Sequence, residues 1–102
     1  MSRHVGLDLG GTNIKTAVIE RREGDWLLLS TGSEQTGASE GPEAVAANLV
    51  AVGSATIAAN DHVETLGLGV PGHFDGDTGR ILLFPNLPGD WEGFPLRDRV
   101  AT

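Results

Sequence analysis

The feature that most constrains the fold is a pair of glycines between two strand-like segments near the start of the chain. Residues His4 to Leu9 and Ile14 to Glu20 are rich in apolar and β-branched residues, and Gly10-Gly11 lies between them. Two such runs joined by a short glycine turn predict an antiparallel β-hairpin. Glycine tolerates positive φ, which we expect at this turn. Both faces of the two strands look apolar, so we expect both to be buried.

The residues around the turn are of types that bind phosphate. Gly10 and Gly11 have no side chain to keep an anion away from the backbone N–H groups, so the backbone can cradle a phosphate. Thr12 supplies a hydroxyl donor, and the carboxylate of Asp8 is a hard ligand suited to Mg²⁺, directly or through water. Lys15 either adds positive charge or is a solvated strand residue. The pattern also fits an ordinary hairpin turn capped by Asp8, and the turn alone does not decide between the two.

Composition narrows the class of protein. The chain has 102 residues, which suits one domain. It carries 14 acidic and 7 basic residues, a formal net charge of −7, which disfavours a nucleic-acid partner. The apolar runs are far shorter than the roughly 20 residues that span a bilayer, and no secretory signal precedes the first strand, so no membrane contact is expected. The absence of cysteine fits a reducing cytoplasm, the location we expect.

The rest of the chain alternates between strands, helices and irregular segments. We expect a third strand from Asp25 to Thr31, a small polar linker from Thr36 to Gly41, and a helix from Pro42 to about Asn60. A fourth strand from Val63 to Val70 is mostly apolar, so we expect it in the centre of the sheet. Irregular loops follow, and a helix begins near Pro95. This order, β-β-β-α-β then loops and a helix start, predicts an α/β fold with a mixed sheet.

Two further motifs have competing interpretations. Residues 67–72 match the G-x-G-x-x-G dinucleotide fingerprint, but Pro71 and the turn-rich loop after it leave no place for the helix that this site requires. Asp75-Gly76-Asp77 has some of the carboxylate spacing of a calcium loop, yet its glycine is misplaced and the terminal glutamate is missing, so we interpret it as a turn. The three histidines are not spaced as metal ligands.

Three segments together resemble the ROK family of sugar kinases and transcriptional repressors. They are Val5 to Lys15, similar to the first phosphate motif of that family, Leu66 to Gly72, similar to its second glycine-rich strand end, and Pro85-Asn86-Leu87 with Trp91 and Pro95-Leu96, similar to its sugar-side loop. They occur in the family's order. The resemblance implies an actin-like ATPase (ribonuclease H-like) fold, of which residues 1–102 form the N-terminal lobe alone.

The resemblance also implies a function. The full-length protein would be a glucokinase-like kinase that transfers a phosphoryl group from ATP, with Mg²⁺, to a hexose, in the first place to O6 of glucose. Asp8 would orient Mg²⁺ and its waters, and the Gly10-Gly11-Thr12 turn would approach the transferred phosphate. The Gly72 backbone and the Asn86 amide would contact the sugar, although each also fits a purely structural role. Trp91 would wall the sugar cleft or fill a gap beneath the loop, and we favour packing.

The same resemblance implies that the remaining parts of the active site lie outside this chain. The catalytic base, the Asp of an Asn-Asp pair, would lie beyond Thr102, because Asn60-Asp61 occurs too early and is expected to end a helix. A structural zinc site would belong to the C-terminal lobe, and the full-length protein would be a homo-oligomer. The isolated chain is therefore expected to be inactive. The sequence leaves open which hexose is the acceptor and whether ATP or polyphosphate is the donor.

Two alternatives belong to other functional classes. The first is the sugar-sensing lobe of a ROK-type repressor, which is disfavoured because four residues before the first strand are too few for a helix-turn-helix. The second is an acetate-kinase-like or actin-like ATPase that shares only the first phosphate motif. It would leave residues 69–72 and 85–87 unexplained.

Overall fold

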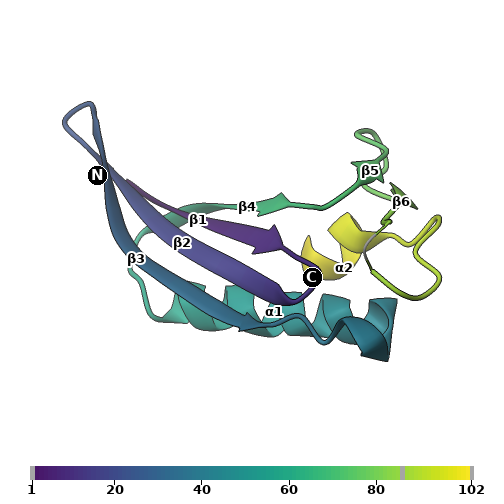
Figure 1. Ribbon diagram of the computed structural model, residues 1–102. Coiled ribbons are helices and arrows are strands. Elements are labelled where there is room, and N and C mark those ends of the chain that lie inside the picture. Colours follow the sequence, from purple (N-terminus) through teal and green to yellow (C-terminus); the bar gives the residue numbers. More distant parts are fainter. Residues whose placement is uncertain (1, 86, 102) are drawn as a thin grey trace.

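The computed structural model describes residues 2–85 and 87–101, and in this part the elements follow the predicted order (Figure 1). The strands are β1 (Ser2–Leu9), β2 (Asn13–Arg22), β3 (Asp25–Gln35), β4 (Val63–Gly69), β5 (His73–Phe74) and β6 (Ile81–Leu83). The helices are η1 (Ala38–Glu40), a short 3₁₀ helix, α1 (Pro42–Ala58) and α2 (Leu96–Ala101). Strand β3 is longer than predicted, and the linker after it contains η1.

The main sheet has four strands in the order β3-β2-β1-β4. Strand β1 is antiparallel to β2 and parallel to β4, and α1 lies in the connection from β3 to β4, at the two outer positions of the sheet. The carboxyl ends of β1 and β4 therefore lie at the same end of the sheet. In α/β proteins, the loops that follow the carboxyl ends of the strands bind ligands.

Strand β4 lies at the edge of the described sheet, so the prediction that it is central is wrong. Its only strand partner among the described residues is β1. The apolar content of β4 has another origin. Leu66 and Leu68 pack against the core on the helix side, while the residues that alternate with them on the other face are small, namely Thr65, Gly67 and Gly69. A strand with one apolar face and one face of small residues gave the appearance of burial on both sides.

Helix α1 covers one face of the sheet, and the opposite face is open in the described part of the chain (Figure 1). The residues that point toward α1 are fully buried, namely Val5, Leu7 and Leu9 of β1 and Ile14 and Val18 of β2. Gly6 and Asp8 alternate with them and are exposed. The prediction that both faces of β1 and β2 are buried is therefore wrong. The alternation has the period of two that a half-buried strand requires.

Both ends of helix α1 follow from its sequence. Pro42 occupies the first turn, where its missing N–H costs nothing, and Glu43 beside it favours the positive end of the helix dipole. At the other end, the Asn60 amide donates a hydrogen bond of 2.8 Å to the Thr56 carbonyl. This contact confirms the prediction that Asn60 ends the helix. On the buried side of α1, Val45 and Leu49 are completely covered by the sheet.

The far end of the core contains a buried carboxylate. Glu20 of β2 is fully buried and forms ion pairs with Arg3, at 3.2 Å, and with Arg22. Burial would raise the pKa of Glu20, but the hydrogen bond from Arg3 and the charge of Arg22 outweigh it, so the pKa of this carboxyl lies below its ordinary value. Glu20 is therefore ionised in the folded chain at neutral pH.

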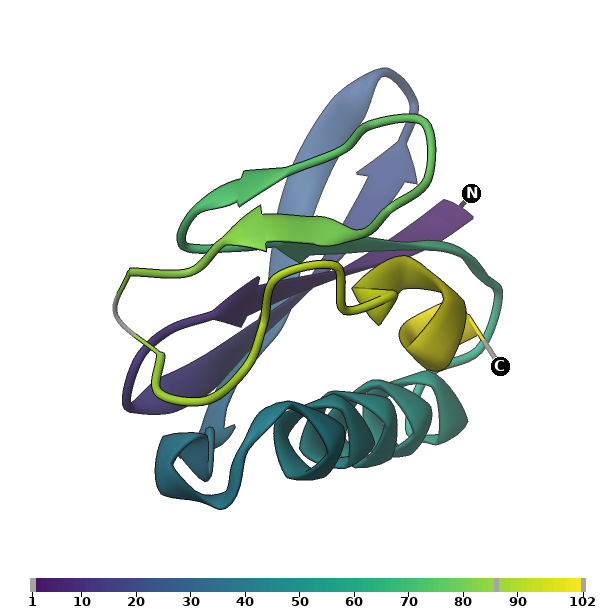
Figure 2. The ribbon, with the colours of Figure 1, turned by 90° about the vertical axis from the view of Figure 1, so that its right-hand side faces the viewer.

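The segment after β4 contains the β5–β6 hairpin and α2, which lie above α1 in the view of Figure 2. The β5–β6 hairpin stands over a cluster of three aromatic rings. Trp91 is buried, with its ring centroid 4.8 Å from that of Phe84 and 5.4 Å from that of Phe94. Its indole N–H donates to the Pro88 carbonyl at 3.1 Å. These contacts confirm that Trp91 packs beneath the loop. Asp75 accepts from the N–H of Asp77, which confirms a turn there.

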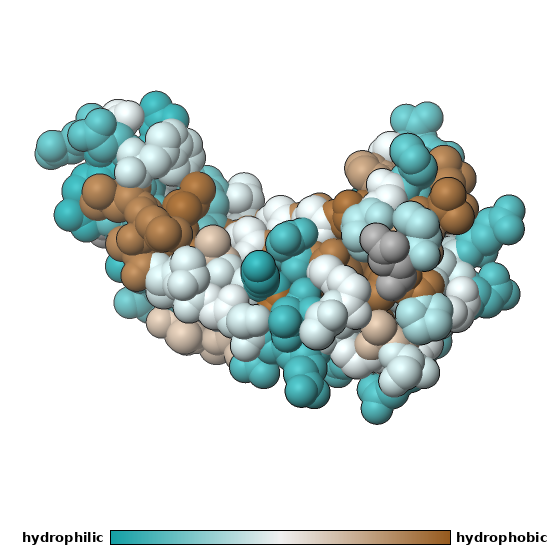
Figure 3. All heavy atoms as spheres, in the orientation of Figure 1, coloured by the Kyte–Doolittle hydropathy of each residue, from teal (hydrophilic) through white to brown (hydrophobic). Residues whose placement is uncertain are grey.

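Apolar side chains are exposed at both ends of the molecule, as the two brown areas of Figure 3 show. At one end they belong to β3, where Trp26, Leu27, Leu28 and Leu29 are each at least 40% exposed. At the other end they belong to the β5–β6 hairpin, where Phe74, Leu82 and Leu83 are exposed. Among the described residues, no helix has the length and apolar character needed to cross a membrane.

Candidate functional site

The β1–β2 turn is closed by a backbone contact at which only glycine fits. The Gly10 N–H donates to the Asn13 carbonyl at 2.9 Å. A Cβ on Gly10 would lie 2.8 Å from that same oxygen, closer than any real side chain approaches. Neither Gly10 nor Gly11 is among the glycines with positive φ, so that expectation is wrong. Glycine is required at position 10 by the tightness of the turn rather than by a left-handed backbone.

Two backbone donors of this turn have no acceptor among the described residues. Gly11 and Thr12 are exposed, and no other described residue accepts a hydrogen bond from either N–H group. Adjacent unpaired N–H groups in a glycine turn are the elements of an anion-binding cradle. The exposed hydroxyl of Thr12 lies on the same turn. The geometry therefore supplies the donors that the sequence predicts at this position.

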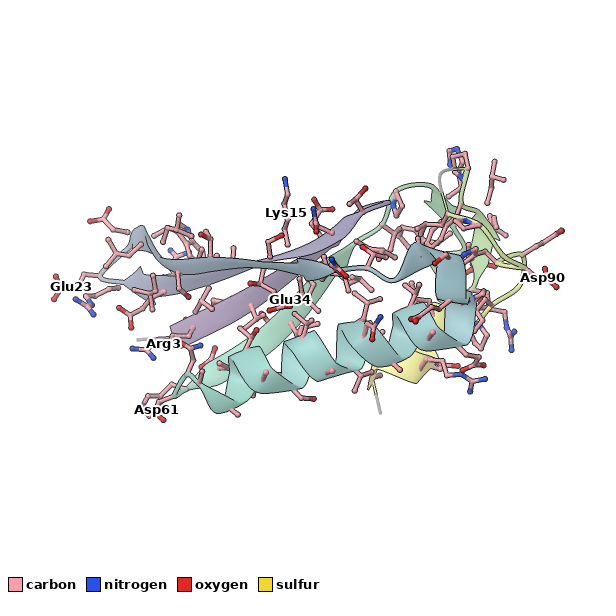
Figure 4. All side chains as sticks on the ribbon, turned by 60° about the horizontal axis from the view of Figure 1, so that its bottom comes forward. Arg3, Lys15, Glu23, Glu34, Asp61 and Asp90 are labelled. Carbon is pink, nitrogen blue, oxygen red and sulfur yellow. The ribbon has the colours of Figure 1, made fainter. Side chains whose placement is uncertain are left out.

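Asp8 and Lys15 lie opposite each other on the open face of the sheet. They are cross-strand neighbours in the register of β1 and β2, and both are exposed. Lys15 points away from α1 in Figure 4. Gly69 of β4 is the neighbour of Asp8 on its other side, and a Cβ there would contact the carboxylate at 3.6 Å. The absence of that Cβ leaves the Asp8 carboxylate accessible beside the turn.

The donor set around Asp8 fits a magnesium ion that keeps most of its water. Among the described residues there is no group of three or more His, Cys, Asp or Glu side chains that could enclose a metal. A single accessible carboxylate beside a phosphate cradle is the kind of site that Mg²⁺ uses, because its other ligands come from water and phosphate. When bound there, the ion would neutralise phosphate charge.

Two residues, Gly72 and Asn86, were predicted to contact the sugar, and the structure describes the first of them. Gly72 lies just beyond β4, at the same sheet edge as the β1–β2 turn. A Cβ on Gly72 would collide with the Leu83 carbonyl and lie 3.0 Å from the Phe84 ring, so glycine is required there for packing against β6. A backbone contact from Gly72 to a sugar stays a prediction. Asn86, the second predicted sugar contact, lies outside the described residues.

Thr36, which was not among the predicted site residues, supports the turn from its buried side. Thr36 is fully buried, and its hydroxyl donates to the Gly10 carbonyl at 2.8 Å while its N–H donates to the Thr12 carbonyl at 2.9 Å. The Asn48 side chain of α1 donates in turn to the Thr36 carbonyl at 3.0 Å. Thr36 fell in the predicted linker because the third strand was predicted to end at Thr31, whereas β3 continues to Gln35. Pairing β3 with β2 as far as Asn13 opposite Gln35 would have placed Thr36 beside Thr12.

Comparison with known proteins finds several sugar kinases among the proteins similar to this chain. No family model matches the chain. It is 29% identical over 97 residues to a glucokinase of Thermotoga maritima, an alignment that covers 95% of this chain and 29% of that protein. The ROK hexokinase of Thermus thermophilus superposes with a TM-score of 0.74 at 40% identity, covering 96% of this chain and 30% of that one.

A third relative supports the fold alone. The inorganic polyphosphate/ATP-glucomannokinase of Arthrobacter sp. strain KM superposes with a TM-score of 0.78 at 22% identity, over 99% of this chain and 40% of that structure. Together these comparisons confirm the resemblance to the ROK sugar kinases and the actin-like ATPase fold class. The chain spans about 30% of the length of the first two relatives.

Proposed function

We propose that this chain, a relative of the ROK sugar kinases, is the N-terminal, phosphate-binding lobe of a kinase that phosphorylates a hexose. The reaction would transfer the γ-phosphoryl group of ATP to a sugar hydroxyl, with glucose and its O6 as the first candidates. The observation that carries the proposal is the β1–β2 turn, where the Gly11 and Thr12 N–H groups have no acceptor within residues 2–85 and 87–101 and Asp8 is exposed on the strand that enters the turn. The similarity to a ROK hexokinase and a glucokinase supports it.

Each group of this turn has a task in the proposed reaction. Phosphoryl transfer depends mainly on positioning and on neutralising charge. The N–H groups of Gly11 and Thr12 would hold phosphate oxygens, Asp8 would hold Mg²⁺ or its waters, and Lys15 would add positive charge at the same face. The base that deprotonates the sugar belongs, in this proposal, to a segment beyond Thr102. A cytoplasmic location, which the lack of cysteine permits, completes the proposal.

A binding titration on the chain itself tests the central step. Addition of Mg²⁺ and ATP to ¹⁵N-labelled protein should shift the amide signals of Gly11 and Thr12. The Asp8→Asn variant should bind the magnesium nucleotide about tenfold more weakly, because it loses the charge that holds the ion. Asp61→Asn is the matched control, since Asp61 is an exposed carboxylate at the far end of α1 (Figure 4).

Two outcomes would contradict the proposal. Equal affinity of the Asp8→Asn variant and the unchanged chain would show that the carboxylate only caps a turn. Shifts confined to residues remote from the turn would place the nucleotide elsewhere.

Tripolyphosphate with Mg²⁺, titrated in parallel, tests the choice of phosphoryl donor. Binding equal to that of ATP would show that this lobe does not select the nucleoside.

A further inference from the structure

We propose that Thr36 is a positioning residue that fixes the direction of the Gly11 N–H, one of the two phosphate-binding donors proposed in the β1–β2 turn. The inference deepens the proposed function and rests on it for the identity of the ligand. It is carried by three hydrogen bonds that meet at Thr36, from its hydroxyl, to its carbonyl and from its N–H.

The direction of the Gly11 N–H follows from the geometry of one peptide group. A peptide bond is planar and trans, so the C=O of one residue and the N–H of the next point in opposite directions. The Thr36 hydroxyl holds the Gly10 carbonyl toward the buried side of the turn at 2.8 Å. The N–H of Gly11, which belongs to the same peptide plane, must therefore point away from Thr36, toward the exposed side.

This constraint matters because the peptide joins two glycines. Neither Gly10 nor Gly11 has a Cβ that would resist rotation of the peptide plane between them. Without a donor that holds its carbonyl in place, the peptide plane can turn over and direct the carbonyl outward, where it would repel a phosphate. The Thr36 hydroxyl gives the turn a single preferred orientation before any ligand binds. Such preorganisation improves affinity because less freedom is lost on binding.

Two further contacts make Thr36 a rigid support. Its N–H donates to the Thr12 carbonyl at 2.9 Å, so Thr36 holds the turn on both sides of Gly11. Its own carbonyl accepts from the Asn48 side chain of α1 at 3.0 Å. The side chain of Thr36 is fully buried, which excludes water as a competing partner. The orientation of the turn is thereby tied to the helix that packs on the sheet.

The first test needs no ligand and no variant. Amide hydrogen exchange on the unchanged chain should show slow exchange at Thr36, whose N–H is buried and bonded, and fast exchange at Gly11, whose N–H points to solvent. A protected Gly11 amide would overturn the inference, because it would mean that the peptide lies the other way round. This measurement does not depend on whether the chain binds a nucleotide.

The second test compares three substitutions in a titration with Mg²⁺ and ATP. Thr36→Val keeps the shape but removes the hydroxyl, and should weaken binding about three- to tenfold while shifting the Gly11 amide signal. Thr36→Ser keeps the hydroxyl and should bind within about twofold of the unchanged chain. Thr56→Val is the matched control, because the Thr56 hydroxyl also donates to a backbone carbonyl, that of Val52, at 2.8 Å within α1.

The outcomes separate this inference from the proposed function. If the unchanged chain binds magnesium nucleotide at the turn and Thr36→Val binds it equally well, the positioning role is wrong and the proposed function stands. If Thr36→Ser loses as much affinity as Thr36→Val, the hydroxyl is not the cause and the inference also fails. If the unchanged chain binds no nucleotide, the proposed function fails, and the exchange measurement still decides the orientation of the Gly10–Gly11 peptide.

Discussion

At the scale of single residues, substitutions of Gly10 and Gly6 test whether the stability of the fold depends on the tight β1–β2 turn or on glycine at any strand position. A Cβ on Gly10 would lie 2.8 Å from the Asn13 oxygen, whereas a Cβ on Gly6 would meet nothing within 4 Å. We expect Gly10→Ala to lower the free energy of unfolding by about 1–3 kcal/mol, because the turn must open to admit a methyl group. Gly6→Ala should be neutral or slightly stabilising, since alanine restricts the unfolded chain more than glycine does. Urea unfolding measures both, and equal stability of the two variants would contradict the tight-turn interpretation.

Glu20 gives the stability of the chain a predictable dependence on pH. Because its pKa is lower in the folded chain than in the unfolded chain, its ionised form stabilises the fold above the unfolded pKa. That contribution is lost as the pH falls through the folded pKa. The Glu20→Gln variant should therefore be less stable than the unchanged chain at pH 7, and the difference should narrow as the solution is acidified below about pH 4.

The measurement is urea unfolding of both proteins between pH 7 and pH 3. Glu43→Gln is the control, because Glu43 forms an exposed ion pair with Arg99 at 2.8 Å, and exposed pairs contribute little. A stability difference for Glu20→Gln that stays constant over this range would show that its carboxylate is not the titrating group.

At the scale of secondary-structure elements, Gly53 sets the distance between α1 and the sheet. A Cβ at this position would lie 3.2 Å from a methyl carbon of Leu66 and 3.5 Å from one of Leu7. Gly53→Leu should push the helix away from β1 and β4 and lower the free energy of unfolding by about 1–3 kcal/mol. Ala47→Leu, an exposed position on the same helix, should change stability by less than about 0.5 kcal/mol. Equal effects in urea unfolding would rule out close packing at Gly53.

The local elements could be predicted from the sequence because their signals are local. The glycine turn and the proline at the start of α1 correctly indicated the hairpin, the helix and their order. The position of β4 could not be read in this way. Its apolar residues report burial against α1, and only the pairing with β1, some sixty residues earlier, decides its place in the sheet. Long-range pairing of this kind leaves no mark in a window of sequence.

The candidate site likewise contains residues that a local sequence pattern indicates and one residue that it does not. Asp8, Gly10, Gly11, Thr12 and Lys15 lie within eight consecutive residues, and the structure places them on one hairpin as predicted. Thr36 is distant in sequence and of an ordinary residue type, so no local pattern indicates its role. It is found only when the register of β3 against β2 is known. Supporting residues of a site are in general harder to predict than the residues that face the ligand.

At the scale of the whole molecule, we expect residues 1–102 alone to show no measurable kinase activity. The proposed reaction needs a catalytic base and a second wall for the nucleotide, neither of which is assigned to this chain. A chimera in which this chain replaces the matched segment of the Thermus thermophilus ROK hexokinase should consume ATP in the presence of glucose. Coupled assays on both proteins make the comparison. Robust turnover by the isolated chain would overturn the assignment as one lobe of a larger enzyme.

The mixed sheet also determines when the parts of this protein can assemble during synthesis. Strands β1, β2 and β3 are neighbours both in the sequence and in the sheet, so a nascent chain can join them as soon as they leave the ribosome. The partner of β1 on its other side, β4, is made only after α1. Until α1 is made, the apolar side of the three-stranded meander has no cover and is exposed to aggregation. The β1–β2 turn can thus form before the helix that covers the sheet and before the last strand of the sheet, β4.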